Sequence, residues 1–365
     1  MSFSGSYRSG EVDFLLTRLP SQAQAFTSVA EKERLIQSGQ RHYSQMLSPE
    51  SVPSARYMAV FEQACRANNP RMAQDCLRLA GLIAARREGA ITLVSLARAG
   101  TPVGVVVARL LREVVKREAV HYSVSIVRDR GIDAAALRHL LAGSHTPESI
   151  VFVDGWTGKG VIARELASSV EVFNMRHGTH IDAGLHVLSD LAGAAACAAS
   201  CDDYLIPSSI LNATVSGLVS RTVMNQDMRA DDFHGCVFYD QFAEVDRSQS
   251  FADELLRLAL ALAQSEAQPR AQAIDATAAR ARSQTYIAGA MRRYGVADVN
   301  LVKPGIGEAT RVLLRRVPRM LLLREPDNPA VAHLRLLAEE KAVPVEIDPA
   351  LPYPAVSLIR SASDA

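Results

Sequence analysis

The stretch Ile150-Val151-Phe152-Val153-Asp154-Gly155-Trp156-Thr157-Gly158-Lys159-Gly160 joins an apolar run to an acid and then to a glycine-rich loop. The apolar run predicts a buried strand, and the residues after Gly160 have the composition of a helix. Glycines let backbone N–H groups turn toward an anion, and a helix N-terminus adds partial positive charge. The stretch therefore predicts a strand–loop–helix unit of an α/β sheet, with a phosphate-binding loop at Thr157, Gly158, Lys159 and Gly160.

The loop does not fit two familiar phosphate-binding motifs. A Walker A motif needs a glycine where Val153 stands and a Ser or Thr where Gly160 stands, and no Gly-x-Gly-x-x-Gly pattern is present. An ordinary tight turn is the alternative interpretation. The carboxylate of Asp154 suits a ribose hydroxyl or a magnesium ion better than a phosphate, so the loop is predicted to bind a sugar phosphate.

A second apolar run, from Ala90 to Leu96, ends in Ala97-Arg98-Ala99-Gly100-Thr101-Pro102. Pro102 suits the first turn of a helix, and Arg98 adds a fixed charge that could hold a diphosphate. Two such loops at neighbouring strand ends predict a crevice at the carboxyl edge of an open, mainly parallel α/β sheet.

The two loops resemble those of the type I phosphoribosyltransferases. The resemblance implies that Arg98, Ala99 and Gly100 bind the pyrophosphate of PRPP, with Mg²⁺ as its companion ion. It implies that Asp154 contacts the ribose and that the loop from Thr157 to Gly160 binds the 5′-phosphate.

A finer resemblance covers nearly the whole chain, through Ser95 to Gly104, Val151 to Gly160, Pro207 to Thr222 and Lys303 to Thr310. These segments resemble the phosphoribosyltransferase-like proteins of bacterial tellurite-resistance and stress operons, a family often labelled cysteine protease StiP. Those proteins carry a C-terminal Pelota-like RNA-binding domain. The resemblance implies RNA contacts at Lys303, Gly305, Gly307, Arg311 and Arg315; a generic loop with solvated arginines is the alternative.

Three further segments carry polar residues that could contact an acceptor molecule. Arg128 and Arg130 follow a predicted strand and fit either a mobile loop or a solvated turn. His177 and His180 fit a hood over the acceptor; with Asp182 and His186 they could instead hold a metal, but their spacing matches no zinc signature. The third segment offers Ser209, Asn212, Ser216 and Arg221, where tight packing of small residues is the alternative.

The five cysteines test the protease label. A thiol protease needs a thiolate, a positioned histidine and an oxyanion hole, and no cysteine here stands in a local signature. Buried structural cysteines are the favoured interpretation. Cys197, Cys201 and Cys236 are the candidates for a nucleophile.

Composition limits the protein class. The chain has 365 residues, 48% hydrophobic and 22% charged, and a net charge of +1 that gives no overall attraction to nucleic acid. The N-terminus lacks an apolar signal segment, no apolar run is long enough to span a membrane, and the cysteines form no even framework. A cytoplasmic protein is expected, and a homodimer is an open expectation.

The expected fold is a phosphoribosyltransferase-like, mainly parallel sheet with a helical cap, followed by a small α/β domain. Residues 1–20 are expected to form a partly ordered arm, and helices are expected at 53–67 and 70–88. Strands are expected at 91–96, 120–127, 150–154, 171–174 and 204–206, alternating with helices, with an Ala- and Leu-rich helix at 182–199. Pro269 is expected to mark the domain boundary. The expected parts are an arm and cap (1–88), a core with hood (89–265), a helical linker (266–284) and the RNA-binding domain (285–365).

The leading hypothesis is a Mg-PRPP-dependent transferase of nucleotide metabolism that acts on a nucleobase-like acceptor in a stress response. A PRPP- or nucleotide-sensing RNA-binding module without turnover is the first alternative, because Gly155 replaces an acid that the transferases usually have. A cysteine protease is the second.

Overall fold

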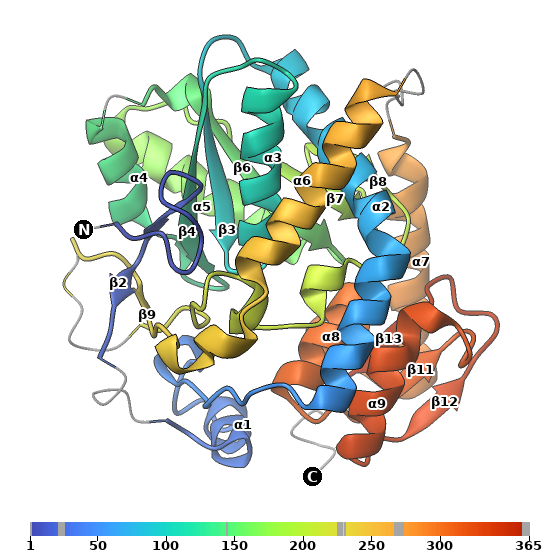
Figure 1. Ribbon diagram of the computed structural model, residues 1–365. Coiled ribbons are helices and arrows are strands. Elements are labelled where there is room, and N and C mark those ends of the chain that lie inside the picture. Colours follow the sequence, from blue (N-terminus) through green and yellow to red (C-terminus); the bar gives the residue numbers. More distant parts are fainter. Residues whose placement is uncertain are drawn as a thin grey trace.

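A computed structural model describes residues 2–20, 26–143, 145–224, 229, 231–265 and 274–359, and it is a mixed α/β protein (Figure 1). Its central sheet is mainly parallel and has the strand order β1-β4-β3-β6-β7-β8. The bounds are β1 Asp13–Leu15, β3 Ile91–Ala97, β4 Ala119–Val127, β6 Ile150–Thr157, β7 Leu185–Asp190 and β8 Cys197–Ser200; a short β5, Gly131–Ile132, pairs antiparallel with β4. The mainly parallel α/β sheet predicted from the sequence is confirmed.

Helices cover both faces of this sheet, as near-continuous apolar strands require. On one face lie α2 (Ala55–Arg86), α3 (Thr101–Glu113) and α6 (Ser248–Gln264), which share a core with the strands. On the other face lie α4 (Ala134–Ala142) and α5 (Val161–His177). Local signals set their starts: Pro102 stands in the first turn of α3, and the Asp133 carboxylate accepts N–H bonds at the start of α4.

The C-terminal region is a smaller α/β unit. Its sheet has the order β10-β13-β11-β12, with β10 Val302–Pro304, β11 Met320–Leu323, β12 Val345–Ile347 and β13 Ala355–Leu358. The helix α7 (Ala276–Tyr294) precedes it, and α8 (Ile306–Arg315) and α9 (Ala332–Glu340) belong to it. Apolar residues of α8 and α9 join the core of the larger sheet, so the two units pack against each other (Figure 1).

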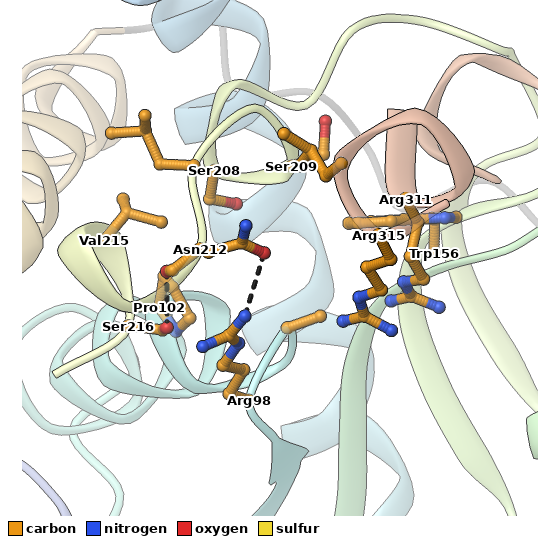
Figure 2. A pocket seen from close by; sticks show the side chains of 13 residues that line it. Arg98, Pro102, Trp156, Ser208, Ser209, Asn212, Val215, Ser216, Arg311 and Arg315 are labelled. Carbon is orange, nitrogen blue, oxygen red and sulfur yellow. Dashed lines mark hydrogen bonds between the residues drawn. The ribbon is translucent and has the colours of Figure 1, made fainter. Parts of the chain in front are cut away.

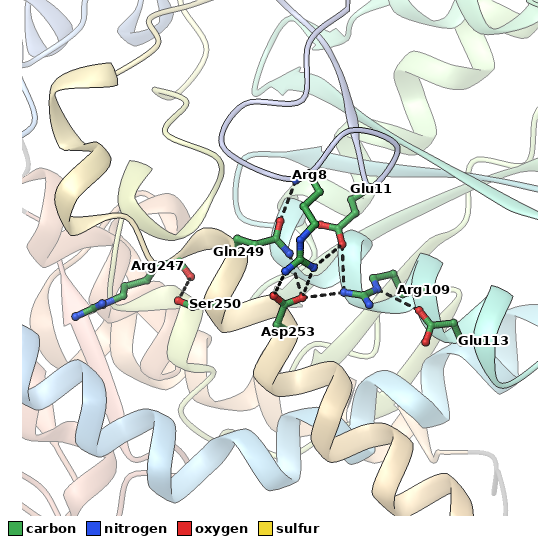
Figure 3. Close-up of polar contacts among 8 residues, drawn as sticks. All are labelled: Arg8, Glu11, Arg109, Glu113, Arg247, Gln249, Ser250 and Asp253. Atoms are coloured by element: carbon green, nitrogen blue, oxygen red, sulfur yellow. Dashed lines mark hydrogen bonds and ion pairs between the residues drawn. The ribbon is translucent and has the colours of Figure 1, made fainter.

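The N-terminal segment is ordered, whereas the sequence suggests a partly ordered arm. β1 adds to the edge of the central sheet beside β4, and β2 (Thr17–Arg18) pairs with β9 (Gly235–Cys236). Arg8 and Arg109 both contact Asp253 of α6, at 2.7 and 2.9 Å, and Arg109 also contacts Glu11 at 3.1 Å (Figure 3). Apolar residues at 12–16 supply the burial that orders this segment.

The helices expected at 53–67 and 70–88 are one helix, α2, that passes through Pro70. The helix expected at 182–199 is wrong, because β7 and β8 occupy this segment. The strand expected at 171–174 lies within α5, and Tyr204–Ile206 forms no strand in the described residues. Pro269, the expected domain boundary, lies outside the described residues.

The remaining elements are short. The helix α1 spans Val29–Gln37, and 3-10 helices lie at Tyr43–Gln45, Pro147–Ser149, Pro207–Ser209 (η3), Ala213–Val215 (η4), Asp240–Val245, Val299–Leu301 and Pro329–Val331. The segment 207–222 is therefore two 3-10 turns rather than a regular helix. Within the described ranges, every helix falls short of the length or apolarity needed to cross a membrane.

Candidate functional site

Arg98 leaves the carboxyl end of β3 and is 7% exposed. Its guanidinium contacts the Glu50 carboxylate at 2.7 Å and donates to the carbonyl of Val219 at 2.9 Å and the side chain of Asn212 at 2.8 Å (Figure 2). The Glu50 carboxylate thus neutralises the Arg98 guanidinium, which the sequence predicted to bind a diphosphate. The loop after β3 is held together from within rather than left open for a ligand.

The amide and glycine of this loop are also used internally. The Gly100 N–H donates to the Leu96 carbonyl at 3.0 Å, so it does not point toward a ligand. A Cβ at Gly100 would lie 2.8 Å from the Val153 carbonyl. Glycine is needed here because β3 and β6 pack closely, which explains the residue without a phosphate.

The loop after β6 is closed in a similar way. The Gly160 N–H donates to Thr157 Oγ1 at 2.9 Å, and Lys159 Nζ donates to the Val299 carbonyl at 2.6 Å. A Cβ at Gly158 would lie 2.7 Å from Glu308 Cγ, in the C-terminal unit. This loop is therefore a contact surface for the C-terminal unit, and Gly158 makes room for that contact.

Asp154 is buried beside the same junction, with its carboxylate accepting the Gly155 N–H at 2.8 Å. Burial raises the pKa of this carboxyl to about 6, while the nearby Arg311 acts in the opposite direction. This carboxyl is therefore protonated more readily than an exposed aspartate. Among the described residues, no group of three or more His, Cys, Asp and Glu could hold a metal.

The residues predicted to contact RNA lie against the core. The Arg311 guanidinium stacks over the Trp156 ring at 4.7 Å, and a Cβ at Gly307 would lie 2.5 Å from that ring. Gly305 has a φ of +92°, and the next amide, Ile306 N–H, donates to the Asp203 carboxylate at 3.0 Å. Asp203 of the larger unit therefore caps α8, whose own N-cap residue is a glycine.

Two cavities lie on either side of Trp156 and Arg311. The smaller has a volume of about 30 Å³ and is lined by Arg98 and Arg315; in Figure 2 the Arg98 guanidinium points toward Asn212, and Arg315 lies beside Arg311. Ser208, Ser209, Asn212 and Ser216 also line it, and the hydroxyls of Ser208 and Ser209 have no hydrogen-bond partner among the described residues. The larger, of about 550 Å³, is lined by Arg128, Lys159, Arg221, Lys303 and Arg315, among others.

The structure brings most, but not all, of the predicted site residues together at this carboxyl edge. Arg130 is exposed on the turn before β5 and lines neither cavity. His177 ends α5 and His180 follows it, and both are exposed. Because a helix that leaves the carboxyl edge ends at the amino edge of the sheet, these histidines lie away from the cavities.

Two residues of this region were not predicted from the sequence. Glu50, which neutralises Arg98, precedes α2 in an unremarkable loop. Tyr43 receives the Arg128 N–H at 2.8 Å, and the guanidiniums of Arg128 and Arg221 both lie 5.8 Å from its ring. Both depend on long-range packing, for which the sequence around them carries no local signal.

The five cysteines are all unpaired thiols. Burial raises the pKa of Cys65 and Cys236 to about 12 and that of Cys201 to about 11. Burial also raises the pKa of Cys76. Each of these thiols is therefore protonated at neutral pH, which is unfavourable for a resting nucleophile.

Cys197 differs from the other cysteines in its neighbours. The register of the parallel strands β7 and β8 pairs it with His186, and paired residues on adjacent parallel strands project from the same face, about 4.8 Å apart in the backbone. Burial raises the pKa of Cys197, but the guanidiniums of Arg86 and Arg78 act against this. The pair lies at the amino ends of the strands, away from both cavities.

His186 is held in one orientation. Its Nδ1 lies 3.2 Å from the Phe152 carbonyl and 3.1 Å from the Gly184 carbonyl, so Nδ1 carries the proton and Nε2 is left as an acceptor. Burial lowers its pKa to about 4, and the nearby Asp182 carboxylate opposes that shift. The ring is therefore neutral at physiological pH, the state that a general base requires.

Comparisons with known proteins give two matches along the chain. Residues 5–256 are similar to the family described as "Tellurite-like stress resistance cysteine protease StiP", and residues 281–361 to the PELOTA RNA binding domain. A curated relative, "Cysteine protease StiP" of Acinetobacter baylyi (strain ATCC 33305 / BD413 / ADP1), is 42% identical over 373 residues. The match covers 98% of this chain and 94% of the relative.

These findings overturn the leading hypothesis from the sequence. The prediction of a PRPP-dependent phosphoribosyltransferase of nucleotide metabolism is wrong, because both the family and the relative are named as cysteine proteases. The resemblance to tellurite-resistance and StiP proteins is confirmed, as is the Pelota-like region. The closed loops at Arg98 and Thr157 explain in physical terms why a transferase pattern misled the prediction.

Proposed function

This chain belongs to the StiP family of tellurite-like stress resistance proteins, and on that premise we propose that it is a cysteine protease with Cys197 as its nucleophile. His186 is its general base. The observation that carries the assignment is the strand register, which sets Cys197 directly beside His186. No other described cysteine is paired with a histidine across neighbouring strands.

The position of β8 suits a peptide substrate. It is the last strand of the central sheet, at the end opposite β1. Terminal strands can accept an extended peptide by main-chain pairing, which is a common mode of peptide recognition. A substrate bound along β8 would run past Cys197, the first residue of that strand.

The reaction follows from the state of the two side chains. His186 Nε2 takes the thiol proton, and the Cys197 thiolate attacks the peptide carbonyl carbon. The tetrahedral intermediate collapses to a thioester as the imidazolium gives its proton to the departing amine. Water, deprotonated by the same nitrogen, then hydrolyses the thioester and restores the thiol.

In the resting structure Cys197 is only 6% exposed, and Arg86 donates to the neighbouring Ala196 carbonyl at 2.7 Å. Because the thiol is covered in this state, a substrate reaches it only if neighbouring groups move. The charge of Arg86 opposes the rise in the thiol pKa that burial causes, so Arg86 makes the thiolate less unfavourable.

The test uses single serine substitutions at the three candidate cysteines, followed by digestion of fluorescently labelled casein. Cys197→Ser should abolish thiol-dependent cleavage, and His186→Gln should reduce it at least about 100-fold. Cys201→Ser and Cys236→Ser are the matched controls and should retain wild-type activity. Full activity in Cys197→Ser, with activity lost in one control, would move the nucleophile to that residue.

RNA binding by the C-terminal unit is a second function, favoured by the Pelota match at 281–361. In this region α8 carries Arg311 and Arg315, and Lys303 stands just before it. Fluorescence anisotropy of a labelled RNA hairpin with the full chain tests this function. Binding that weakens as salt rises is the expected result, because phosphate contacts release counterions.

A further inference from the structure

The cavity of about 550 Å³ lies between the two units of the protein. Its walls come from Tyr43, the loop after β6, and residues between Asp298 and Arg316 of the C-terminal unit. The volume is within the range of about 300–1,000 Å³ that ligand sites occupy. It is thus a space of binding-site size that both units build.

The cavity is strongly cationic. Eight lysine or arginine residues and two acidic residues line it, although the whole chain has a net charge of only +1. One of the acids, Glu308, contacts Arg311 at 3.3 Å and Lys303 at 4.0 Å, and so is shared between two cations. The lining therefore has six more positive than negative groups, whereas the rest of the chain is net negative.

Crowding of these cations is unfavourable without an anion. Burial and the nearby Lys303 lower the pKa of Lys159 to about 7. Burial lowers the pKa of Lys303, and the nearby Arg128 lowers it further. An anion in the cavity would restore the charge of both lysines, since an opposite charge favours the charged form.

We propose that RNA binds with phosphate groups inside this cavity, so that the core and the C-terminal unit hold one RNA strand together. The inference rests on the proposed RNA-binding function and names its site. Arg128 and Lys159 contact phosphate from the core, and Lys303 and Arg315 contact it from the C-terminal unit. Such contacts read the backbone and give little sequence preference.

The arrangement favours RNA over a free phosphate compound for two reasons. One wall belongs to the region that matches an RNA-binding domain, and the lining cations come from both the core and the C-terminal unit. Because α8 is packed against the core, side chains of the core line the same cavity and can contact the RNA directly. A Pelota-like unit alone would then bind RNA more weakly than the full chain.

The test measures binding of a labelled single-stranded RNA to the full chain as salt varies. Arg128→Gln and Lys159→Gln, both in the core, should each weaken binding about 5–10-fold at 50 mM salt and reduce the slope of log K against log salt by about 0.7. The matched control is Arg293→Gln. Arg293 lies in the Pelota-matched region, on α7, and its side chain is 57% exposed and paired with Glu346.

Other outcomes would overturn the inference. If the wild type binds RNA but the two core variants bind equally well, RNA uses another face; the RNA-binding function then stands and the cavity assignment fails. If the wild type binds no RNA at 50 mM salt, both fail. If inorganic triphosphate binds, depends on Arg128, and is not displaced by RNA, the cavity serves a small phosphate ligand instead.

Discussion

Replacing Asp154 with asparagine is expected to stabilise the protein above neutral pH. The side chain is 5% exposed on β6, and burial raises its pKa from 3.8 to about 6. Because the folded-state pKa lies above the unfolded one, the native protein holds more protons between these values. The free energy of unfolding contributed by this group is therefore full below about pH 4 and falls as the pH rises through about 6.

The size of the effect follows from the shift. A difference of roughly two pKa units corresponds to about 3 kcal/mol, at about 1.4 kcal/mol per unit. Asparagine cannot ionise, and its side-chain oxygen can still accept the Gly155 N–H, which Asp154 accepts at 2.8 Å. Asp154→Asn should therefore exceed the wild type by up to about 3 kcal/mol at pH 8 and match it at pH 4.

Urea unfolding between pH 4 and pH 8 measures this, followed through Trp156, the single tryptophan of the chain. Asp327→Asn is the control, because that carboxylate is 95% exposed and should give no pH-dependent difference. A variant that is less stable than the wild type at pH 8 would refute the reasoning. It would mean that the cations around the cavity hold Asp154 as an anion.

Three further substitutions test long-range contacts, two at the candidate site and one at the N-terminal segment. Arg98→Gln should cost about 3 kcal/mol of unfolding free energy in urea, because it leaves the Glu50 carboxylate without its ion-pair partner. Gly307→Ala should cost about 1–3 kcal/mol and shift Trp156 emission, since its Cβ would lie 2.5 Å from the ring; unchanged emission would argue against this packing. Arg109→Gln should cost about 1–2 kcal/mol in the same assay and lose most of that effect in high salt, because its guanidinium links the N-terminal segment to α6 through two carboxylates.

The strand–loop–helix units from Ile91 to His177 could be predicted because local signals agree with tertiary structure there. Apolar runs of strand length end in small residues, and Pro102 or Asp133 marks the next helix start. These signals need no knowledge of distant residues. The small C-terminal α/β unit that the sequence predicts is also observed, although its last strand, β13, was not predicted.

The segment 182–199 shows where local reasoning fails. Its alanines and leucines have high helix propensity, yet β7 and β8 are buried strands of a parallel sheet. Short apolar runs fit either state, and packing against β6 and α2 decides between them. Gly193, with a φ of +59°, turns the chain between the two strands, which a helix would not need.

The pair that we propose as catalytic was hidden by the same error. A helix at 182–199 makes Asp182 and His186 neighbours and places Cys197 three turns away, whereas the strands put His186 and Cys197 side by side. A wrong secondary structure thus separated two residues that the register brings together. The remaining contacts, such as Arg98 with Glu50 and Asn212, join segments far apart in sequence, and only the folded chain reveals them.

The glycine-rich loop after β6 has a structural role that the sequence pattern of a phosphate site could not distinguish. Glycine permits close approach of any partner to the backbone, and here the partner is the C-terminal unit, through Glu308 at Gly158 and the Trp156 ring at Gly307. Lys159 of this loop also stabilises the junction, because its Nζ donates to the Val299 carbonyl. The cations that would have held a sugar phosphate instead line a space that forms only when the two units dock. If RNA fills that space, it contacts both units, and RNA should therefore raise the free energy of unfolding of both units together. RNA that stabilises the C-terminal unit alone would show that the junction is structural and that the cavity plays no part in recognition.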